Sequence, residues 1–302
     1  MILSWFFTLW VMGCNVVKTH QARISHAVER HGFEEATIEL GEHSIHHWVG
    51  GEGPPLVLLH GFGGNGLATW WLQARSLSKS HRVIIPDLLW FGDSKSDAQP
   101  SLDAQANAVE SLVTHLVEDG EHVDVVGISY GGFVALRYGS IAPQQQRRVV
   151  VMDSPGPLFT DEDEVAILKT YRVDTVDELF VPTTTEHVRA LIGLAYHRPP
   201  PLPQFVLKQF KEGFFSANQD EQRALILDLK KNRDRYQAQT MAQYESSLVI
   251  WGQHDPIFPT HMGRSLAELI GAEFCVIDNA GHAPNLDKPA IVNQKLQSFL
   301  KP

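Results

Sequence analysis

The sequence has little cysteine and no concentration of positive charge. Among 302 residues only Cys14 and Cys275 occur, too few for a disulfide framework and without the spacing of a zinc site. Cys275 lies in an apolar stretch and is interpreted as a buried strand residue. With 25 basic and 35 acidic side chains the formal charge is −10, and no basic cluster could follow a phosphate backbone. Nucleic acid is therefore not an expected partner.

No apolar run is long enough to cross a bilayer as a helix, but Ile2 to Gly13 is apolar and uncharged. This run is typical of the apolar region of a signal peptide or of an anchor. The four residues that end at Cys14 resemble the box at which bacterial lipoproteins are cleaved and lipidated, although no lysine or arginine precedes the run. A lipidated Cys14, an uncleaved interfacial anchor, a plain signal peptide and a wrongly assigned start stay open, with residues 15–33 as a tether or lead-in helix. We expect a membrane-associated or extracytoplasmic protein, with a secreted or periplasmic one as the alternative.

Strand and helix patterns alternate along most of the chain, which predicts an α/β fold with a mostly parallel sheet and helices on both faces. The first two predicted strands, 35–40 and 44–49, form an antiparallel hairpin. The later strands are Pro55–Leu59, 83–85, 123–126, 147–153, 248–250 and 274–277. From 154 to 246 helical stretches and prolines replace the strands. We therefore divide the chain into an N-terminal segment (1–33), a core (34–153 and 247–302) and a helical cap insertion (154–246).

A sharp strand-turn-helix segment centres on Ser129. The strand 123–126 leads into Gly127-Ile128-Ser129-Tyr130-Gly131, and an apolar helix begins at about Phe133. Glycines at both ends of such a turn leave room for a serine that projects above the sheet. The Tyr130 amide would then point toward the oxygen of a bound carbonyl. This pattern predicts that Ser129 is a nucleophile.

Three further loops follow strands at the same predicted edge of the sheet. The glycine-rich loop after Pro55–Leu59 would supply a second oxyanion donor, the amide of Phe62. Asp255 and His282 follow the strands at 248–250 and 274–277. Ligands bind at this edge in parallel sheets, so we expect an acid and a base beside Ser129. Asp153 also follows a strand and is kept as an alternative acid.

Other histidines are given no catalytic or metal role. His46 and His47 would point to opposite faces of a strand, so they are interpreted as exposed strand residues and not as a metal pair. His254 leaves the backbone in a different direction from Asp255 and is not expected to act as the base. No metal site is predicted.

The order serine, acid, histidine resembles that of the α/β hydrolase fold superfamily, and the likeness covers the chain from about residue 35 to its end. Within it, the loops 60–64, 87–94 and 251–259 resemble those of the monoacylglycerol lipase and carboxylesterase branch. Tyr130 stands where many lipases of that branch have methionine. The resemblance implies ester hydrolysis through an acyl-enzyme, with Ser129, Asp255 and His282 as the triad, Phe62 and Tyr130 as the oxyanion hole, and no metal or organic cofactor.

The expected substrate is a carboxylic ester with a medium or long acyl chain, such as a monoacylglycerol, bound at a membrane surface. A subset of the aromatic residues in the cap would line an apolar pocket for it. The same fold and triad also serve carbon–carbon bond hydrolases, peptidases and slow ligand receptors, so these alternatives stay open. A dehalogenase or epoxide hydrolase would need a carboxylate in place of Ser129.

Overall fold

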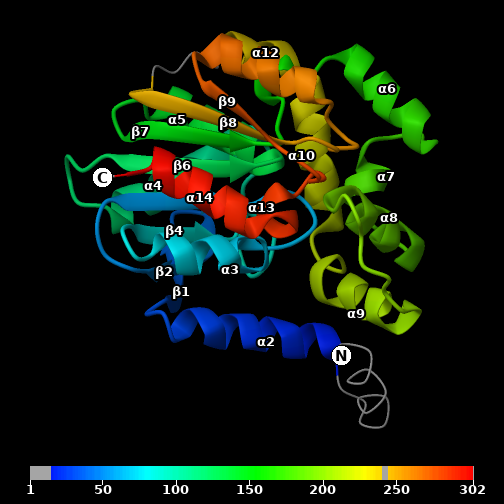
Figure 1. Ribbon diagram of the computed structural model, residues 1–302, viewed down its shortest axis with the longest axis horizontal. Helices are drawn as coiled ribbons and strands as arrows, with labels where there is room; N and C mark the ends of the chain where they lie inside the picture. Colours follow the sequence, from blue (N-terminus) through cyan, green and yellow to red (C-terminus); the bar gives the residue numbers. More distant parts are fainter. Residues whose placement is uncertain (1–14, 240–243, 302) are drawn as a thin grey trace.

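A computed structural model describes residues 15–239 and 244–301. The predictions about the apolar run and Cys14 fall outside these residues. One nine-stranded sheet forms the centre of the described chain, in the order β1-β2-β4-β3-β6-β7-β8-β9, with β5 paired to β2 (Figure 1). The strands are β1 Glu34–Leu40, β2 His43–Gly50, β3 Pro55–Leu59, β4 Arg82–Pro86, β5 Lys95–Ser96, β6 Val123–Ile128, β7 Gln146–Met152, β8 Ser246–Gly252 and β9 Glu273–Ile277.

The sheet is antiparallel only at its start. β1 and β2 form the predicted hairpin, and β2 also runs antiparallel to β4 and β5. From β4 to β9 every neighbouring pair is parallel. The carboxyl ends of β6, β8 and β9 therefore meet at one edge of the sheet, as the sequence predicted.

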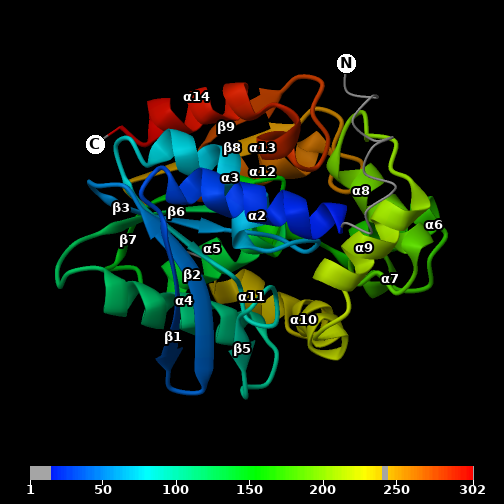
Figure 2. The same ribbon diagram turned by 90° about the horizontal axis from the view of Figure 1, so that it is seen from below.

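Helices cover both faces of this sheet (Figures 1 and 2). Val57 and Leu59 of β3 enter the core that contains α4, α5 and α12, whereas Leu56 and Leu58 enter the core that contains α3 and α14. This alternation is the period of two that a strand buried on both faces requires. The core helices are α3 Gly66–Leu77, α4 Leu102–Leu116, α5 Tyr130–Ile141, α12 Thr260–Ile270, α13 Pro284–Asp287 and α14 Pro289–Phe299.

The chain between β7 and β8 is helical in its described part, and this confirms the predicted cap insertion. Its α6 to α9 lie beyond the carboxyl edge of the sheet (Figure 1). The elements are the 3-10 helix η1 Gly156–Leu158, α6 Asp161–Tyr171, α7 Asp177–Phe180, α8 Thr185–Ala195, α9 Gln204–Phe214, α10 Gln219–Lys231 and α11 Arg233–Gln239.

The lead-in segment forms a 14-residue helix, α2 Val16–Glu29. The side chain of Asn15 caps it by accepting a hydrogen bond from the Lys18 N–H, and Val17, Ile24 and Val28 are buried along one side. Figure 2 shows α2 lying beside α3 with its first turn near α9. There the Val16 N–H donates to Oε1 of Gln209 at 2.8 Å, so α2 packs on both the core and the cap.

Cys275 lies on β9 as predicted, but it is only half buried, because β9 is the edge strand of the sheet. No helix within residues 15–239 and 244–301 combines the length and apolar character needed to cross a membrane.

Candidate active site

Ser129 occupies a strained turn between β6 and α5. Its backbone has φ 53° and ψ −121°, in a region that residues other than glycine rarely adopt. A Cβ on Gly127 would lie 2.1 Å from the Gly131 carbonyl oxygen, and one on Gly131 would lie 2.3 Å from that of Leu59. Both positions therefore require glycine, and the turn holds the serine at the end of the strand.

The structure brings Ser129, His282 and Asp255 together. Nε2 of His282 lies 2.9 Å from Oγ of Ser129, and its Nδ1 lies 2.9 Å from Oδ2 of Asp255. The other oxygen of Asp255 accepts the N–H groups of Ile257 and Phe258 at 2.8 and 3.1 Å. The three side chains come from the ends of β6, β9 and β8, and they form one chain of hydrogen bonds. This arrangement suits proton transfer from a serine to an imidazole held by a carboxylate.

The glycine-rich loop after β3 lies directly against Ser129. A Cβ on Gly61 would lie 2.8 Å from Cβ of Ser129 and 3.1 Å from the carbonyl oxygen of Ile128. The Phe62 ring packs edge-on against Tyr130, with the ring centroids 5.1 Å apart. Tyr130 begins α5, where a backbone N–H has no acceptor within the helix. The two residues predicted as oxyanion donors therefore adjoin Ser129 from different sides.

His60 holds this loop in place through hydrogen bonds, a role that was not predicted from the sequence. Its ring is fully buried, and its Nε2 accepts the N–H of Leu88 at 2.9 Å. Nδ1 must then carry the proton that it donates to the Gly61 carbonyl oxygen at 2.8 Å. Burial lowers the pKa of His60, which favours this neutral form. The histidine thus links the loop after β3 to the loop after β4.

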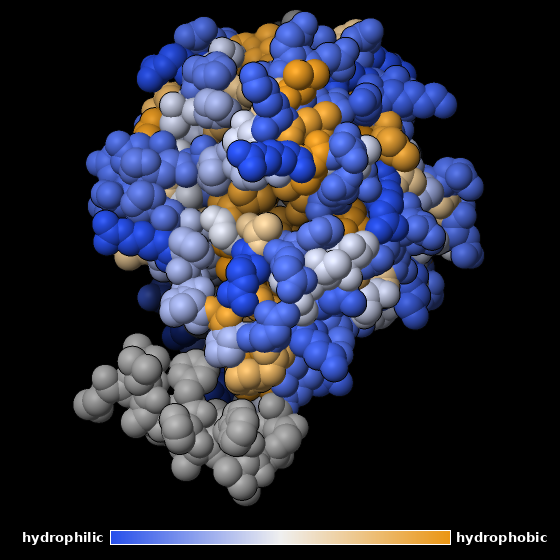
Figure 3. All heavy atoms as spheres, turned by 90° about the vertical axis from the view of Figure 1, so that its right-hand side faces the viewer, coloured by the Kyte–Doolittle hydropathy of each residue, from blue (hydrophilic) through white to orange (hydrophobic). Residues whose placement is uncertain are grey.

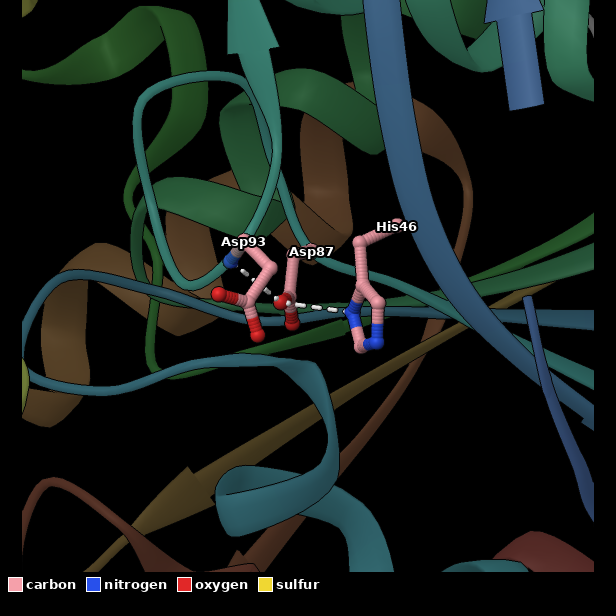
Figure 4. Close-up of side chains that lie close together, drawn as sticks. All are labelled: His46, Asp87 and Asp93. Carbon is pink, nitrogen blue, oxygen red and sulfur yellow. Dashed lines mark hydrogen bonds and ion pairs between the residues drawn. The ribbon is translucent and has the colours of Figure 1, made fainter. Parts of the chain in front are cut away.

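Asp87 organises the loop after β4, and Figure 4 shows it between His46 and Asp93. Its Oδ1 accepts the Gly66 N–H at 2.8 Å, and its Oδ2 accepts the Asp93 N–H at 3.1 Å. Nδ1 of His46 lies 2.9 Å from the same Oδ2. The carboxylate therefore ties β2, the start of α3 and the loop together beneath the active site.

The prediction that His46 and His47 are exposed is wrong. Both are buried, because β2 lies inside the sheet between β1 and β4. His46 lies between two carboxylates, with Nε2 2.8 Å from Oε1 of Glu35. Burial alone lowers the pKa of His46, but its hydrogen bonds and the charges of Asp87 and Glu35 outweigh burial and raise it to about 9.

The His46, Asp87 and Asp93 groups lie close enough together to suggest a metal site, and so do those of Asp153, Asp255 and His282. In the first group both ring nitrogens of His46 face carboxylates, and a charged imidazolium has no lone pair for a metal. In the second group both ring nitrogens of His282 already contact Ser129 and Asp255. Neither set fits a resident metal.

Asp153 and His254 both lie near the triad, but neither contacts Ser129 or takes the place of Asp255 at Nδ1 of His282. Asp153 is fully buried at the end of β7 with φ 43°, and its Oδ1 accepts the Gly252 N–H at 2.7 Å. The His254 ring stacks on His197, with the centroids 4.2 Å apart. His282, and not His254, therefore contacts the serine.

Two apolar cavities meet at Ser129, Phe62 and Phe180. The first has a volume of about 170 Å³ and lies under α6, α7, α10 and α11; the second, of about 300 Å³, lies between α2, α8 and α9. Figure 3 shows apolar side chains around a hollow in the face that carries the cap helices. Further lining residues of the first are Tyr130, Phe133, Leu136, Phe159, Ile167, Leu229 and Phe258; those of the second include Val17, Ile24, Leu191, Ile192, Phe210, Phe214 and His282.

The chain is similar to several hydrolases along most of its length. It is 26% identical over 297 residues to Lipase 1 of Psychrobacter immobilis, which covers 93% of this chain and 90% of the relative. It is 29% identical over 262 residues to the 2-hydroxymuconate semialdehyde hydrolase of Pseudomonas sp. (strain CF600), covering 83% and 88%.

Solved structures share the fold. A membrane phospholipase A superposes with a TM-score of 0.76 at 21% identity, covering 99% of this chain and 96% of that one. A sequence model described as the alpha/beta hydrolase fold matches residues 54–289, which is most of the chain. Together with the sheet order and the cap inserted after β7, this match shows that the protein belongs to the α/β hydrolase fold family.

Proposed function

We propose that the protein is a serine hydrolase that cleaves carboxylic esters through an acyl-enzyme. The observation that carries this proposal is the chain of hydrogen bonds from Asp255 through His282 to Ser129, placed where two apolar cavities meet. Similarity to Lipase 1 of Psychrobacter immobilis supports it. Membership of the α/β hydrolase fold family does not by itself determine which reaction the protein catalyses.

The mechanism follows from the positions of these groups. His282 takes the Ser129 proton as the hydroxyl oxygen attacks the ester carbonyl, and Asp255 orients the imidazole and stabilises its charged form. The amides of Phe62 and Tyr130 bind the oxyanion of the tetrahedral intermediate. His282 then gives the proton to the leaving alcohol. Water activated by His282 hydrolyses the acyl-enzyme, so no metal or organic cofactor takes part.

The two cavities receive different parts of the ester. The leaving alcohol must take its proton from His282, and that residue lines the larger cavity between α2, α8 and α9. We therefore assign this larger cavity to the alcohol and call it the alcohol chamber. The smaller cavity under α6, α7, α10 and α11 does not include His282 in its lining, and we call it the acyl chamber.

The acyl chamber favours a medium or long hydrocarbon chain. Its walls near Ser129 are aromatic and aliphatic, with Phe133, Leu136 and Phe159 among them. Each methylene buried there contributes about 0.8 kcal/mol, so kcat/KM is expected to rise with chain length over the first several carbons. The substrate we propose is a monoacylglycerol or a related ester.

We further propose that the enzyme works at a membrane surface. The apolar run 2–13 and Cys14 belong to the undescribed start of the chain, which leads directly into α2. On the cap, the apolar side chains of Val165, Phe205 and Leu227 are exposed on α6, α9 and α10. One lipid chain binds a bilayer only weakly, so lipidation at Cys14 would add a second contact to this apolar segment.

The test measures kcat/KM for 4-nitrophenyl esters from acetyl to dodecanoyl and for monoacylglycerols, with Ser129→Ala as the control. We expect the longer acyl chains to be preferred and the control to be inactive. A preference for acetyl esters would refute the substrate proposal. Fractionation of cells that express the wild type and Cys14→Ser tests the membrane proposal, which fails if the wild type is wholly soluble.

A carbon–carbon bond hydrolase is the second candidate, favoured by the 29% identity to 2-hydroxymuconate semialdehyde hydrolase. Such an enzyme would turn over a vinylogous diketone of the ring-cleavage type and leave the ester panel nearly untouched. Tight retention of one ligand with slow turnover of every ester would instead indicate a receptor.

A further inference from the structure

The triad has a second buried carboxyl group beside its acid. One side-chain oxygen of Asp153, one of Asp255 and a ring nitrogen of His282 all lie within 4.8 Å of one another. Both aspartate side chains are fully buried. Two negative charges this close inside the protein repel each other strongly. One of the two groups must therefore hold a proton at neutral pH.

The hydrogen bonds around the pair decide which one holds it. Asp255 has partners for both oxygens: two backbone N–H groups on one and the imidazole of His282 on the other. Asp153 accepts the Gly252 N–H on Oδ1, and within the described part of the chain no N–H or O–H group donates to its buried Oδ2. An oxygen that accepts no hydrogen bond is a poor site for a negative charge. If Oδ2 of Asp153 is protonated, its O–H can instead donate a hydrogen bond to Asp255.

We propose that Asp153 is a positioning residue that keeps its acid proton at neutral pH and donates it in a hydrogen bond to Asp255. The bond fixes the Asp255 carboxylate toward Nδ1 of His282, and through His282 it orients the base toward Ser129. This inference rests on the proposed function only where it names Asp255 as the catalytic acid.

The surroundings of Asp153 agree with this assignment. Burial first, and then the charge of Asp255 and a side-chain hydrogen bond with it, raise the pKa of Asp153 well above its usual range, while the Gly252 hydrogen bond opposes the rise. The other titratable groups at this point are His282 and Tyr171, whose hydroxyl donates to the Pro256 carbonyl oxygen beside Asp255. The positive φ of Asp153 is a strained conformation, and such strain concentrates at functional sites.

The first test is the pH dependence of stability in Asp153→Asn, whose carboxamide has the shape and the donor of a protonated carboxyl. Above pH 4 the wild type must take up a proton on folding, whereas the asparagine variant needs none. We expect the unfolding midpoint of Asp153→Asn to be higher than that of the wild type, by a margin that grows from pH 5 to pH 8. A stability difference that stays constant from pH 5 to pH 8 would mean that Asp153 is ionised in the folded protein, and it would overturn the proposal.

Asp87→Asn is the matched control for that test. Asp87 is also a buried aspartate that follows a strand, but its carboxylate already accepts from Gly66 and Asp93 and faces His46. We expect this variant to be less stable than the wild type at both pH values. The stability tests need no substrate, so they remain informative if the proposed function fails.

The second test is kinetic and uses the preferred ester of the wild type. Asp255→Asn is expected to lose about 10⁴-fold in kcat, whereas Asp153→Asn stays within about threefold of the wild type. Asp153→Leu removes the donor, so its kcat should fall by about 10-fold or more while KM changes little, and asparagine at the same position restores the rate. If Asp153→Asn loses as much kcat as Asp255→Asn, the proposal is overturned, and if it loses far more while both variants stay folded, Asp153 is the acid.

Discussion

Nε2 of His282 lies 2.9 Å from Oγ of Ser129, although 153 residues separate the two in the chain. The sheet order explains this approach: Ser129 ends β6 and His282 follows β9, and both strands point the same way across the parallel part of the sheet. In the proposed mechanism, the proton of Ser129 passes to His282 across this contact.

Replacing Ser129 by alanine is expected to lower kcat by a factor on the order of 10⁶, because only oxyanion binding and substrate binding then remain. The variant should also lose covalent labelling by a fluorophosphonate probe. Circular dichroism and the unfolding midpoint serve as the folding control. Labelling that persists in a folded Ser129→Ala protein would show that another residue is the nucleophile.

Replacing Gly61 by alanine should damage the oxyanion loop. The new Cβ would lie 2.8 Å from Cβ of Ser129 and 3.1 Å from the Ile128 carbonyl oxygen, so either the loop or the nucleophile must move. Loss of one oxyanion donor typically lowers kcat by about 10²-fold to 10³-fold, and we expect a loss of that order with KM nearly unchanged.

Gly193→Ala is the control for this substitution. Gly193 lies within α8, where an added Cβ meets no atom within 4 Å, and alanine favours a helix more than glycine does. This variant should keep its kcat. Equal losses in both variants would argue against a special role of the loop at Gly61.

The assignment of the two chambers can be tested by filling each one. Leu229 lines only the acyl chamber, so Leu229→Trp should lower kcat/KM for dodecanoyl esters by about 10-fold or more and leave acetyl esters nearly unaffected, since each lost methylene costs about 0.8 kcal/mol. Ile192 lines only the alcohol chamber. Ile192→Trp should change the preference among alcohols without changing the rate at which a common acyl-enzyme is hydrolysed. The opposite pattern would exchange the two chambers.

The sequence predicted those parts of the site that local patterns determine. Gly127 and Gly131 are required by close backbone contacts within one short turn, and the loops of Asp255 and His282 each follow a clear strand. The cap insertion was expected from the absence of strand patterns and from the helical stretches and prolines between 154 and 246. Strand alternation and glycine placement therefore led to the fold and to the three residues that the structure brings together.

Tertiary packing determined what the sequence did not predict. His46 and His47 were expected to be exposed, but they are buried because β2 lies between β1 and β4. The alternation of residues along one strand does not show where that strand lies in the sheet. Cys275 is half buried because β9 became the edge. The packing of α2 on α3 and α9 depends on a weakly amphipathic helix, and the closeness of Asp153 to Asp255 depends on two neighbouring strand ends.

The ion pairs that His46 makes with Asp87 and Glu35 predict how stability changes with pH. Because the folded-state pKa of His46 is about 9 and the unfolded value is 6.5, the native state binds the extra proton between these two values. The stabilisation by His46 is thus fully present below about pH 6.5 and is lost as pH rises through about 9. A difference of this size corresponds to on the order of 3 kcal/mol in unfolding free energy.

His46→Asn should remove most of this dependence, since asparagine does not titrate. The measurement is chemical unfolding of the wild type and of His46→Asn at closely spaced pH values from 6 to 10. The difference in unfolding free energy should be largest at pH 6 and shrink toward pH 10, because the wild type alone loses a bound charge. A difference that does not change across this range would mean that His46 is not charged between Asp87 and Glu35, and that the loop after β4 is held by neutral hydrogen bonds alone.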